Sequence, residues 1–132
     1  LLRVGPSNLN QTPGVDVQAG DFVTSTMLSP NQTFTGSPML YALQPYASGP
    51  PMGVNPTLPG SVMDTTQPGV VLFGFGGGPL GPVVLPPGGQ DVAFVIPPGL
   101  TGITVRLQGY VISPLAGNGV WAGTDGRDLR IQ

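Results

Sequence analysis

The sequence contains no lysine, glutamate, histidine or cysteine. Lysine and glutamate supply most exposed helical faces, so their absence argues against surface helices. Without histidine or cysteine, transition-metal sites of the usual kind are disfavoured. A serine or threonine nucleophile would also lack the histidine or lysine base that activates it. Without cysteine, no disulfide contributes to stability. We therefore expect a protein that is not an enzyme and carries no resident cofactor.

Charge is also scarce. Only 8% of the residues are charged and the formal net charge is -2, whereas soluble domains carry roughly 25% charged residues. Four scattered arginines do not form the basic cluster that displaces counterions from nucleic acid, so we expect no nucleic-acid partner. No run of about 18 apolar residues is present, so we expect no membrane span.

The location is predicted from the same composition. Few charges combined with many Thr, Ser, Asn, Gln and Gly residues are typical of secreted surface proteins. No signal-peptide pattern is visible, and the chain begins at Leu1 without Met, as a processed or partial chain would. The sequence therefore predicts an extracellular or cell-surface protein.

Glycine and proline are abundant, with 22 and 17 residues among the 132. They interrupt the chain every few positions, which excludes long helices and favours short strands and turns. Apolar residues make up 39% of the chain and recur in blocks, unlike a disordered chain. We predict one all-β domain over residues 1–132: an antiparallel β-sandwich, with the jelly roll as one candidate form, long Gly/Pro-rich loops and no substantial helix.

The clearest strands lie within residues 91–113, which read as a hairpin-like unit with a Pro-Pro-Gly corner. Alternation across its longer strand, 103–112, separates an apolar face from a polar face that includes Tyr110. Gly109 interrupts the apolar row and predicts either a bulge or the close approach of another segment. The other expected strands cover residues 1–4, 21–28, 39–46, 69–75 (central and buried on both sides), 83–85, 120–122 and 128–132, with loops at 7–20 and 47–61.

The C-terminal third resembles a known group of proteins. It has an I-P-x-x-L-x-G corner (Ile96 to Gly102), a strand containing Leu107-Gln108, and a closing strand ending at Ile131. These features resemble secreted β-sandwich domains of planctomycete and myxobacterial extracellular proteins. The resemblance implies a secreted β-sandwich and no particular activity. The cysteines frequent in those domains are missing here.

Two motifs point to enzymes but each lacks a required residue. The run Gly74-Phe75-Gly76-Gly77-Gly78 departs from the nucleotide-loop spacing and no lysine follows it, so a linker is favoured. Asp64 lies in Met-Asp-Thr-Thr, a near match to the apolar-Asp-Thr/Ser-Gly signature of aspartic proteases. Thr66 replaces the glycine that the active-site turn needs, so a loop is favoured.

Asp125 and Asp128 are candidate calcium ligands, because Ca²⁺ binds six to eight oxygens. The alternative is a tight Asp-Gly turn between the last two strands, with Asp128 paired to Arg127 or Arg130. Asn10 and Asn31 each begin an Asn-Gln-Thr triplet, the acceptor pattern for N-glycosylation, or else are ordinary turn residues.

Aromatic residues suggest a sugar site. Tyr110 and Trp121 would stack on the apolar face of a pyranose, while the alternative is ordinary cross-strand packing.

Two functions follow. The first is a non-enzymatic structural subunit of an extracellular filament or surface layer, a homo-oligomer or polymer. In it an extended N-terminal arm, residues 1–10, would pair with the open sheet edge of a neighbour through Leu1, Leu2, Arg3 and Val4. The alternative is a secreted carbohydrate-binding or adhesion module.

Overall fold

A computed structural model describes residues 2–5, 14–47, 69, 71–73 and 84–132. Within these ranges the chain forms strands, turns and bends and no helix, so the all-β prediction is confirmed. The strands are β1 (Leu2–Gly5), β2 (Gly14–Val17), β3 (Phe22–Met27), β4 (Met39–Tyr46), β5 (Val71–Phe73), β6 (Gln90–Val95), β7 (Thr104–Ile112), β8 (Trp121–Gly123) and β9 (Arg127–Ile131).

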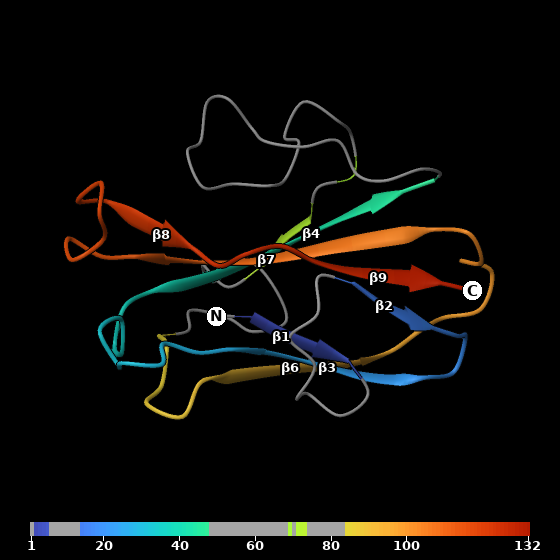
Figure 1. Ribbon diagram of the computed structural model, residues 1–132, viewed down its shortest axis with the longest axis horizontal. Coiled ribbons are helices and arrows are strands. Elements are labelled where there is room, and N and C mark those ends of the chain that lie inside the picture. The colour runs from blue at the N-terminus through green and yellow to red at the C-terminus, as the bar shows by residue number, and fades with distance from the viewer. Residues whose placement is uncertain (1, 6–13, 48–68, 70, 74–83) are drawn as a thin grey trace.

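The strands form two sheets that lie one above the other (Figure 1). The smaller sheet has the order β1-β3-β6, and the larger has the order β2-β9-β7-β4-β5, with β8 also paired to β7. β7 is the central strand of the larger sheet, because it pairs with β4 along one side and with β9 and β8 in succession along the other. The longest predicted strand is therefore the one around which the larger sheet is built.

The prediction of purely antiparallel pairing is wrong at one place. β2 runs parallel to β9, with Gly14 opposite Asp128 and Val17 opposite Ile131. This strand lies inside a segment predicted to be loop, because its four residues are too few for a visible alternation pattern. Its partner is supplied by the far end of the chain, which no local pattern reveals.

The segment 91–113 is not a hairpin, because its two strands lie in different sheets. β6 belongs to the smaller sheet and β7 to the larger, so the corner between them carries the chain from one layer to the other. Pro97 and Pro98 have no backbone N–H and cannot continue a ladder. The turn is completed by Gly99 and Gly102, both at a φ of 86°, where side chains are disfavoured.

The apolar run at 69–75 was predicted to be a central strand, and this is wrong. Of the described residues in this run, Val71–Phe73 form a strand, β5, which lies at the end of the larger sheet and pairs with β4 alone among the described strands. A short continuous apolar run fits several environments, so periodicity does not fix its place in a sheet. Of the strand predicted at 83–85, residues 84 and 85 are described, and they contribute a single bridge, between Pro38 and Val84.

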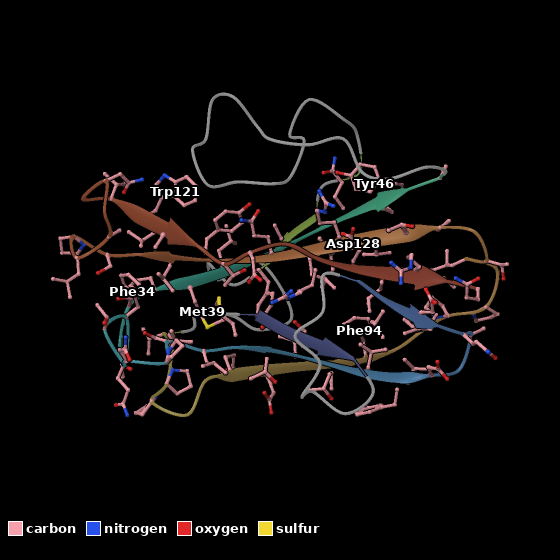
Figure 2. All side chains as sticks on the ribbon, in the orientation of Figure 1. Phe34, Met39, Tyr46, Phe94, Trp121 and Asp128 are labelled. Carbon is pink, nitrogen blue, oxygen red and sulfur yellow. The ribbon has the colours of Figure 1, made fainter. Side chains whose placement is uncertain are left out.

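The core lies between the two layers. It is a cluster of buried residues from both sheets: Val17, Val23, Met27, Met39, Tyr41, Leu85, Ile96, Leu107, Val111, Leu129 and Ile131. Met39 and Phe94 are seen in this space in Figure 2. The predicted apolar face of β7 is thus confirmed as its inward face.

Two contacts fix how the sheets meet. Gly109 lies opposite Met27 of the smaller sheet, so close that a Cβ at position 109 would collide with the Met27 sulfur. This close approach is one of the two alternatives predicted for Gly109. Tyr41 crosses the core, and its hydroxyl lies 3.4 Å from the carbonyl oxygens of Ser25 and Gln90. Burial raises the pKa of Tyr41 well above its ordinary value, because the phenolate would lose its hydration.

Candidate functional site

The outward face of the larger sheet carries a repeated pair of residues. Gln44 and Tyr46 on β4 have the same spacing as Gln108 and Tyr110 on β7. Each tyrosine hydroxyl donates to the amide oxygen of the glutamine two residues earlier, at 2.5 Å on β4 and 2.7 Å on β7. Residues i and i+2 share a face of a strand, so these four side chains form one polar row.

Both glutamines are fully buried although they point away from the core between the sheets. The Gln108 amide nitrogen also donates to the carbonyl oxygen of Thr124 at 2.6 Å. A buried amide held by several hydrogen bonds is rigid, because each broken bond would leave a polar atom unpaired. The sequence prediction missed both glutamines, although the twice-occurring Gln-x-Tyr spacing was a usable signal.

Tyr110 and Trp121 lie together on this face. β8 pairs with β7 so that Trp121 is opposite Ile112. The rings of Tyr110 and Trp121 pack with their centroids 5.4 Å apart and their planes at 55°. The side chain of Asn118 accepts hydrogen bonds from the backbone N–H groups of Val120 and Trp121, which fixes the turn before β8. Both aromatic residues are half-buried. The tilted contact is typical of cross-strand aromatic packing, and it brings two half-buried aromatic side chains to one place.

An ion pair lies next to this row. Arg106 binds both carboxylate oxygens of Asp128 across β7 and β9, at 2.7 and 2.9 Å. Both side chains are about four-fifths shielded from solvent. The hydrogen bond to Asp128 raises the pKa of the Arg106 guanidinium above its ordinary value. Two parallel N–H···O bonds fix the geometry as well as the charge.

The candidate calcium ligands each have an arginine partner. Asp128 pairs with Arg106, and Asp125 pairs with Arg127 at 2.5 Å. Over the described ranges, no group of three or more acidic, histidine or cysteine side chains is placed to hold a metal. The arginine pairing predicted for Asp128 is present, although the partner is Arg106 rather than Arg127 or Arg130. A calcium ion would have to compete with these arginines for the carboxylate oxygens.

The N-terminal assembly strand is accounted for in part. Leu1 lies outside the described residues, while Leu2, Arg3 and Val4 belong to β1 and face Met27, Thr26 and Ser25 of β3. β1 is at the end of the smaller sheet and β6 is at the other end. Among the described strands nothing pairs with the second side of either, so both edges present backbone donors and acceptors.

Several large apolar side chains are exposed. Phe22 and Val95 are register partners on the smaller sheet, and both are more than half exposed. Ile112, Leu115 and Val120 are exposed near the loop between β7 and β8. We call these the β3–β6 patch and the β7–β8 patch. In Figure 1 the β6–β7 corner, next to Val95, and the β7–β8 loop lie at opposite ends of the long axis.

A comparison with protein-family models, curated proteins and solved structures finds no match to this chain. The resemblance to secreted planctomycete and myxobacterial domains therefore stays a prediction. Among the described residues, no helix is long and apolar enough to cross a membrane.

The remaining candidates divide between described and undescribed residues. Asn31 and the two residues after it are exposed, so that triplet is accessible to modification. Asn10, Asp64 and the glycine run at 74–78 lie outside the described residues. The structure thus brings Tyr110 and Trp121 together, gives the two aspartates separate partners, and places β1 at a sheet edge.

Proposed function

We propose that the protein is a non-enzymatic structural subunit that assembles with copies of itself outside the cell. The observation that supports this most directly is the place of β1. This strand pairs only with β3 among the described strands, through four register positions from Leu2 to Gly5. A neighbouring copy carries an identical strand and an identical β3 edge. Exchange of β1 between copies would therefore re-form the same hydrogen bonds between chains.

The exposed apolar patches are consistent with such packing. The β3–β6 patch and the β7–β8 patch lie toward opposite ends of the long axis. A contact between unlike ends leaves a free end on each copy, so it repeats into a filament instead of closing into a dimer. With 8% charged residues, close approach of copies meets little electrostatic repulsion.

For the fold, we infer a β-sandwich whose strand order resembles the immunoglobulin type more than a jelly roll. Taken in chain order, β1, β3 and β6 correspond to strands A, B and E of one sheet. β4, β5, β7 and β9 correspond to strands C, C′, F and G of the other. Strand D has no counterpart among the described strands. The two facing layers and the core between them support this inference.

Strand exchange is tested by disulfide trapping, which is clean here because the chain has no cysteine. Arg3 and Thr26 are direct register partners, and the Cα atoms of such pairs are about 4.5–5.5 Å apart, within disulfide range. The variant Arg3→Cys/Thr26→Cys is oxidised before and after assembly and run on a non-reducing gel. We expect monomers before assembly and a ladder of linked chains afterwards.

The control variant is Arg3→Cys/Ala93→Cys. Ala93 is exposed on β6, one strand further from β1 and two residues along from the level of Arg3, so the two Cα atoms are about 12 Å apart and beyond disulfide reach. This variant should give no ladder. Electron microscopy and light scattering report whether particles form at all, and deletion of residues 1–10 should abolish them. Particles that contain only internally bonded monomers would refute strand exchange while leaving the subunit function intact.

A second candidate function is carbohydrate binding, favoured by the contact between Tyr110 and Trp121. Their hydrogen-bonded neighbours would orient a sugar by accepting from its hydroxyls while the rings supply apolar contact. Trp121 is the single tryptophan, so its fluorescence reports this place alone. Titration with soluble polysaccharides, with and without Ca²⁺, should change the emission if a glycan binds there. An unchanged spectrum, together with unchanged retention on polysaccharide columns, would exclude this function.

A further inference from the structure

Asn118 is the one asparagine of this chain that is followed by glycine. In such a pair the backbone nitrogen of the glycine can attack the side-chain amide carbon of the asparagine. Glycine favours this attack, because it has no side chain to crowd its nitrogen and lets the backbone bend freely. Asn118 and Gly119 both lie exposed in the loop between β7 and β8, at one end of the long axis in Figure 1. The pair is therefore open to water and to spontaneous modification.

The reaction is a deamidation. The Gly119 nitrogen loses its proton to hydroxide and forms a bond to Cγ of Asn118, and the bond between Cγ and Nδ2 then breaks. The amide nitrogen takes up a proton and leaves as ammonia, so that a succinimide ring remains. Water opens the ring at either carbonyl group. The products are aspartate and isoaspartate, in which the backbone runs through the former side chain, and water is the one co-reactant consumed.

The structure holds both reacting groups in hydrogen bonds. The Oδ1 atom of Asn118 accepts from the backbone N–H groups of Val120 and Trp121, both at 2.9 Å. The Gly119 N–H, whose proton must be lost, donates to the Ala116 carbonyl oxygen at 2.8 Å. The attacking nitrogen thus keeps its proton in a hydrogen bond while the loop is closed, and the amide carbon is fixed toward the residues that follow. Ring formation therefore needs the loop to open.

The same hydrogen bonds hold the start of β8. Trp121 begins this strand and packs on Tyr110, with the ring centroids 5.4 Å apart, and Figure 2 shows it beside β8 on the outer side of the larger sheet. Isoaspartate adds a carbon to the backbone and makes the former amide carbonyl part of it, so the two bonds to Oδ1 cannot re-form in the same geometry. The product also places a negative charge next to Leu115 and Val120 of the β7–β8 patch.

From these contacts, we propose that Asn118 is a self-modification site whose deamidation is controlled by the opening of the β7–β8 loop, and that the isoaspartate product releases Trp121 from its position. The change is irreversible under these conditions, because ammonia is lost, so the loop records how long the chain has existed. The site requires neither proposed function. Its product nevertheless alters the β7–β8 patch of the one and the aromatic pair of the other.

The first test measures the rate of the reaction on the full chain. The protein is kept in mildly alkaline buffer with and without urea. Trypsin cleavage after Arg106 and Arg127 releases residues 107–127 as one peptide, in which mass spectrometry follows the conversion of Asn118. We expect the folded chain to react at least about ten-fold more slowly than the unfolded chain, because the hydrogen-bonded pair reacts only after local opening. Equal rates would overturn the control by the loop.

A matched pair of variants assigns this control to the β7–β8 loop. The Ser113 hydroxyl oxygen accepts from the Leu115 N–H at 3.2 Å inside this loop, and the Ser29 hydroxyl oxygen accepts from the Phe34 N–H at 3.3 Å between β3 and β4. Loss of one such bond in Ser113→Ala should raise the folded rate about five-fold and leave the unfolded rate unchanged. Ser29→Ala should change neither rate. An unchanged folded rate in Ser113→Ala, or equal acceleration in both variants, would overturn the assignment.

The last test measures what the product does. The isoaspartate form is separated by chromatography, and its emission reports on Trp121 alone, because the chain has a single tryptophan. We expect a shifted emission spectrum. Asn118→Asp supplies the charge without the longer backbone, and its carboxylate can accept from the same two N–H groups, so it should keep the original spectrum. Asn118→Gln would need a larger ring and should keep the original spectrum on storage.

Three results would overturn the release of Trp121. The first is an unchanged spectrum in the isoaspartate form. The second is the same shift in Asn118→Asp, which would assign the effect to charge instead of the backbone. The third is the same shift in stored Asn118→Gln, which would place its cause outside this residue.

Discussion

The contact between Gly109 and Met27 predicts a large effect from one added methyl group. Gly109 is buried in β7 and is the register partner of Tyr41 of β4. A Cβ there would overlap the Met27 sulfur and lie 3.3 Å from its two neighbouring carbons. Overpacking of this kind costs about 1–3 kcal/mol. Alanine restricts the unfolded chain more than glycine and returns about 0.4–1 kcal/mol, so Gly109→Ala should destabilise the fold by about 1–2 kcal/mol.

The assay is urea unfolding followed by circular dichroism and by Trp121 fluorescence. A loss of about 1.5 kcal/mol lowers the midpoint by roughly 1 M urea for a slope of about 1.5 kcal/mol/M. Gly117→Ala is the matched control, because nothing lies within 4 Å of its added Cβ. The control should be neutral or slightly stabilising. Equal midpoints for the two variants would refute the proposed clash.

A double variant tests whether Met27 is the cause. Met27→Ala alone should cost about 2–5 kcal/mol through the cavity it leaves. In Met27→Ala/Gly109→Ala the new methyl group enters that space without a clash. The double variant should therefore be more stable than the sum of the single effects predicts, by about 1–2 kcal/mol. Strict additivity would show that Gly109 is constrained by something other than Met27.

Three further predictions concern buried polar groups. The raised pKa of Tyr41 means that the folded state holds the phenol proton more tightly than the unfolded state does. The stability that the protonated phenol contributes is therefore complete below about pH 10 and is lost as the pH rises further. Tyr41→Phe should flatten the fall of the urea midpoint above about pH 10, and an equally steep fall in this variant would contradict the argument. Ser25→Ala removes an unpaired buried hydroxyl and should raise the free energy of unfolding by about 1 kcal/mol in chemical denaturation; a loss of similar size would reveal an unrecognised partner. Asp128→Ala breaks the shielded pair with Arg106 and should lower the free energy of unfolding by about 1.5–3 kcal/mol. Asp16→Ala breaks an exposed pair with Arg130 and should lower it by under about 0.5 kcal/mol in the same assay. Equal losses in the two variants would refute the role of burial.

Strand positions were largely predictable, because the alternation of apolar and polar residues and the glycines and prolines between strands can be seen in a short stretch of sequence. The strand predicted at 39–46 has the bounds of β4, and the one at 103–112 differs from β7 by one residue. Which strands pair was not predictable. The 91–113 segment looks like a hairpin locally, yet its corner crosses between layers because the partners of β6 and β7 come from distant parts of the chain.

The candidate site shows the same division. Tyr110 and Trp121 were identified by residue type, and their contact depends on the β7–β8 pairing, which the sequence places only approximately. The buried glutamines were missed because glutamine is usually exposed. Their burial depends on the whole sheet, and only the repeated Gln-x-Tyr spacing hints at it.

The parallel pairing of β2 with β9 has a mechanical consequence. Val17 lies opposite Ile131, and the Gln132 amide donates to the Val17 carbonyl oxygen at 2.9 Å. A tension that pulls on the chain before β2 and after β9 acts along both strands in opposite directions. The hydrogen bonds between β2 and β9 are then loaded in shear and must break together. If the force instead peeled one strand away from its partner, the bonds would break one at a time. The Arg130–Asp16 pair, at 2.6 Å, lies within the same patch. A chain pulled from before β2 and after β9 would thus resist stretching where these two strands lie side by side.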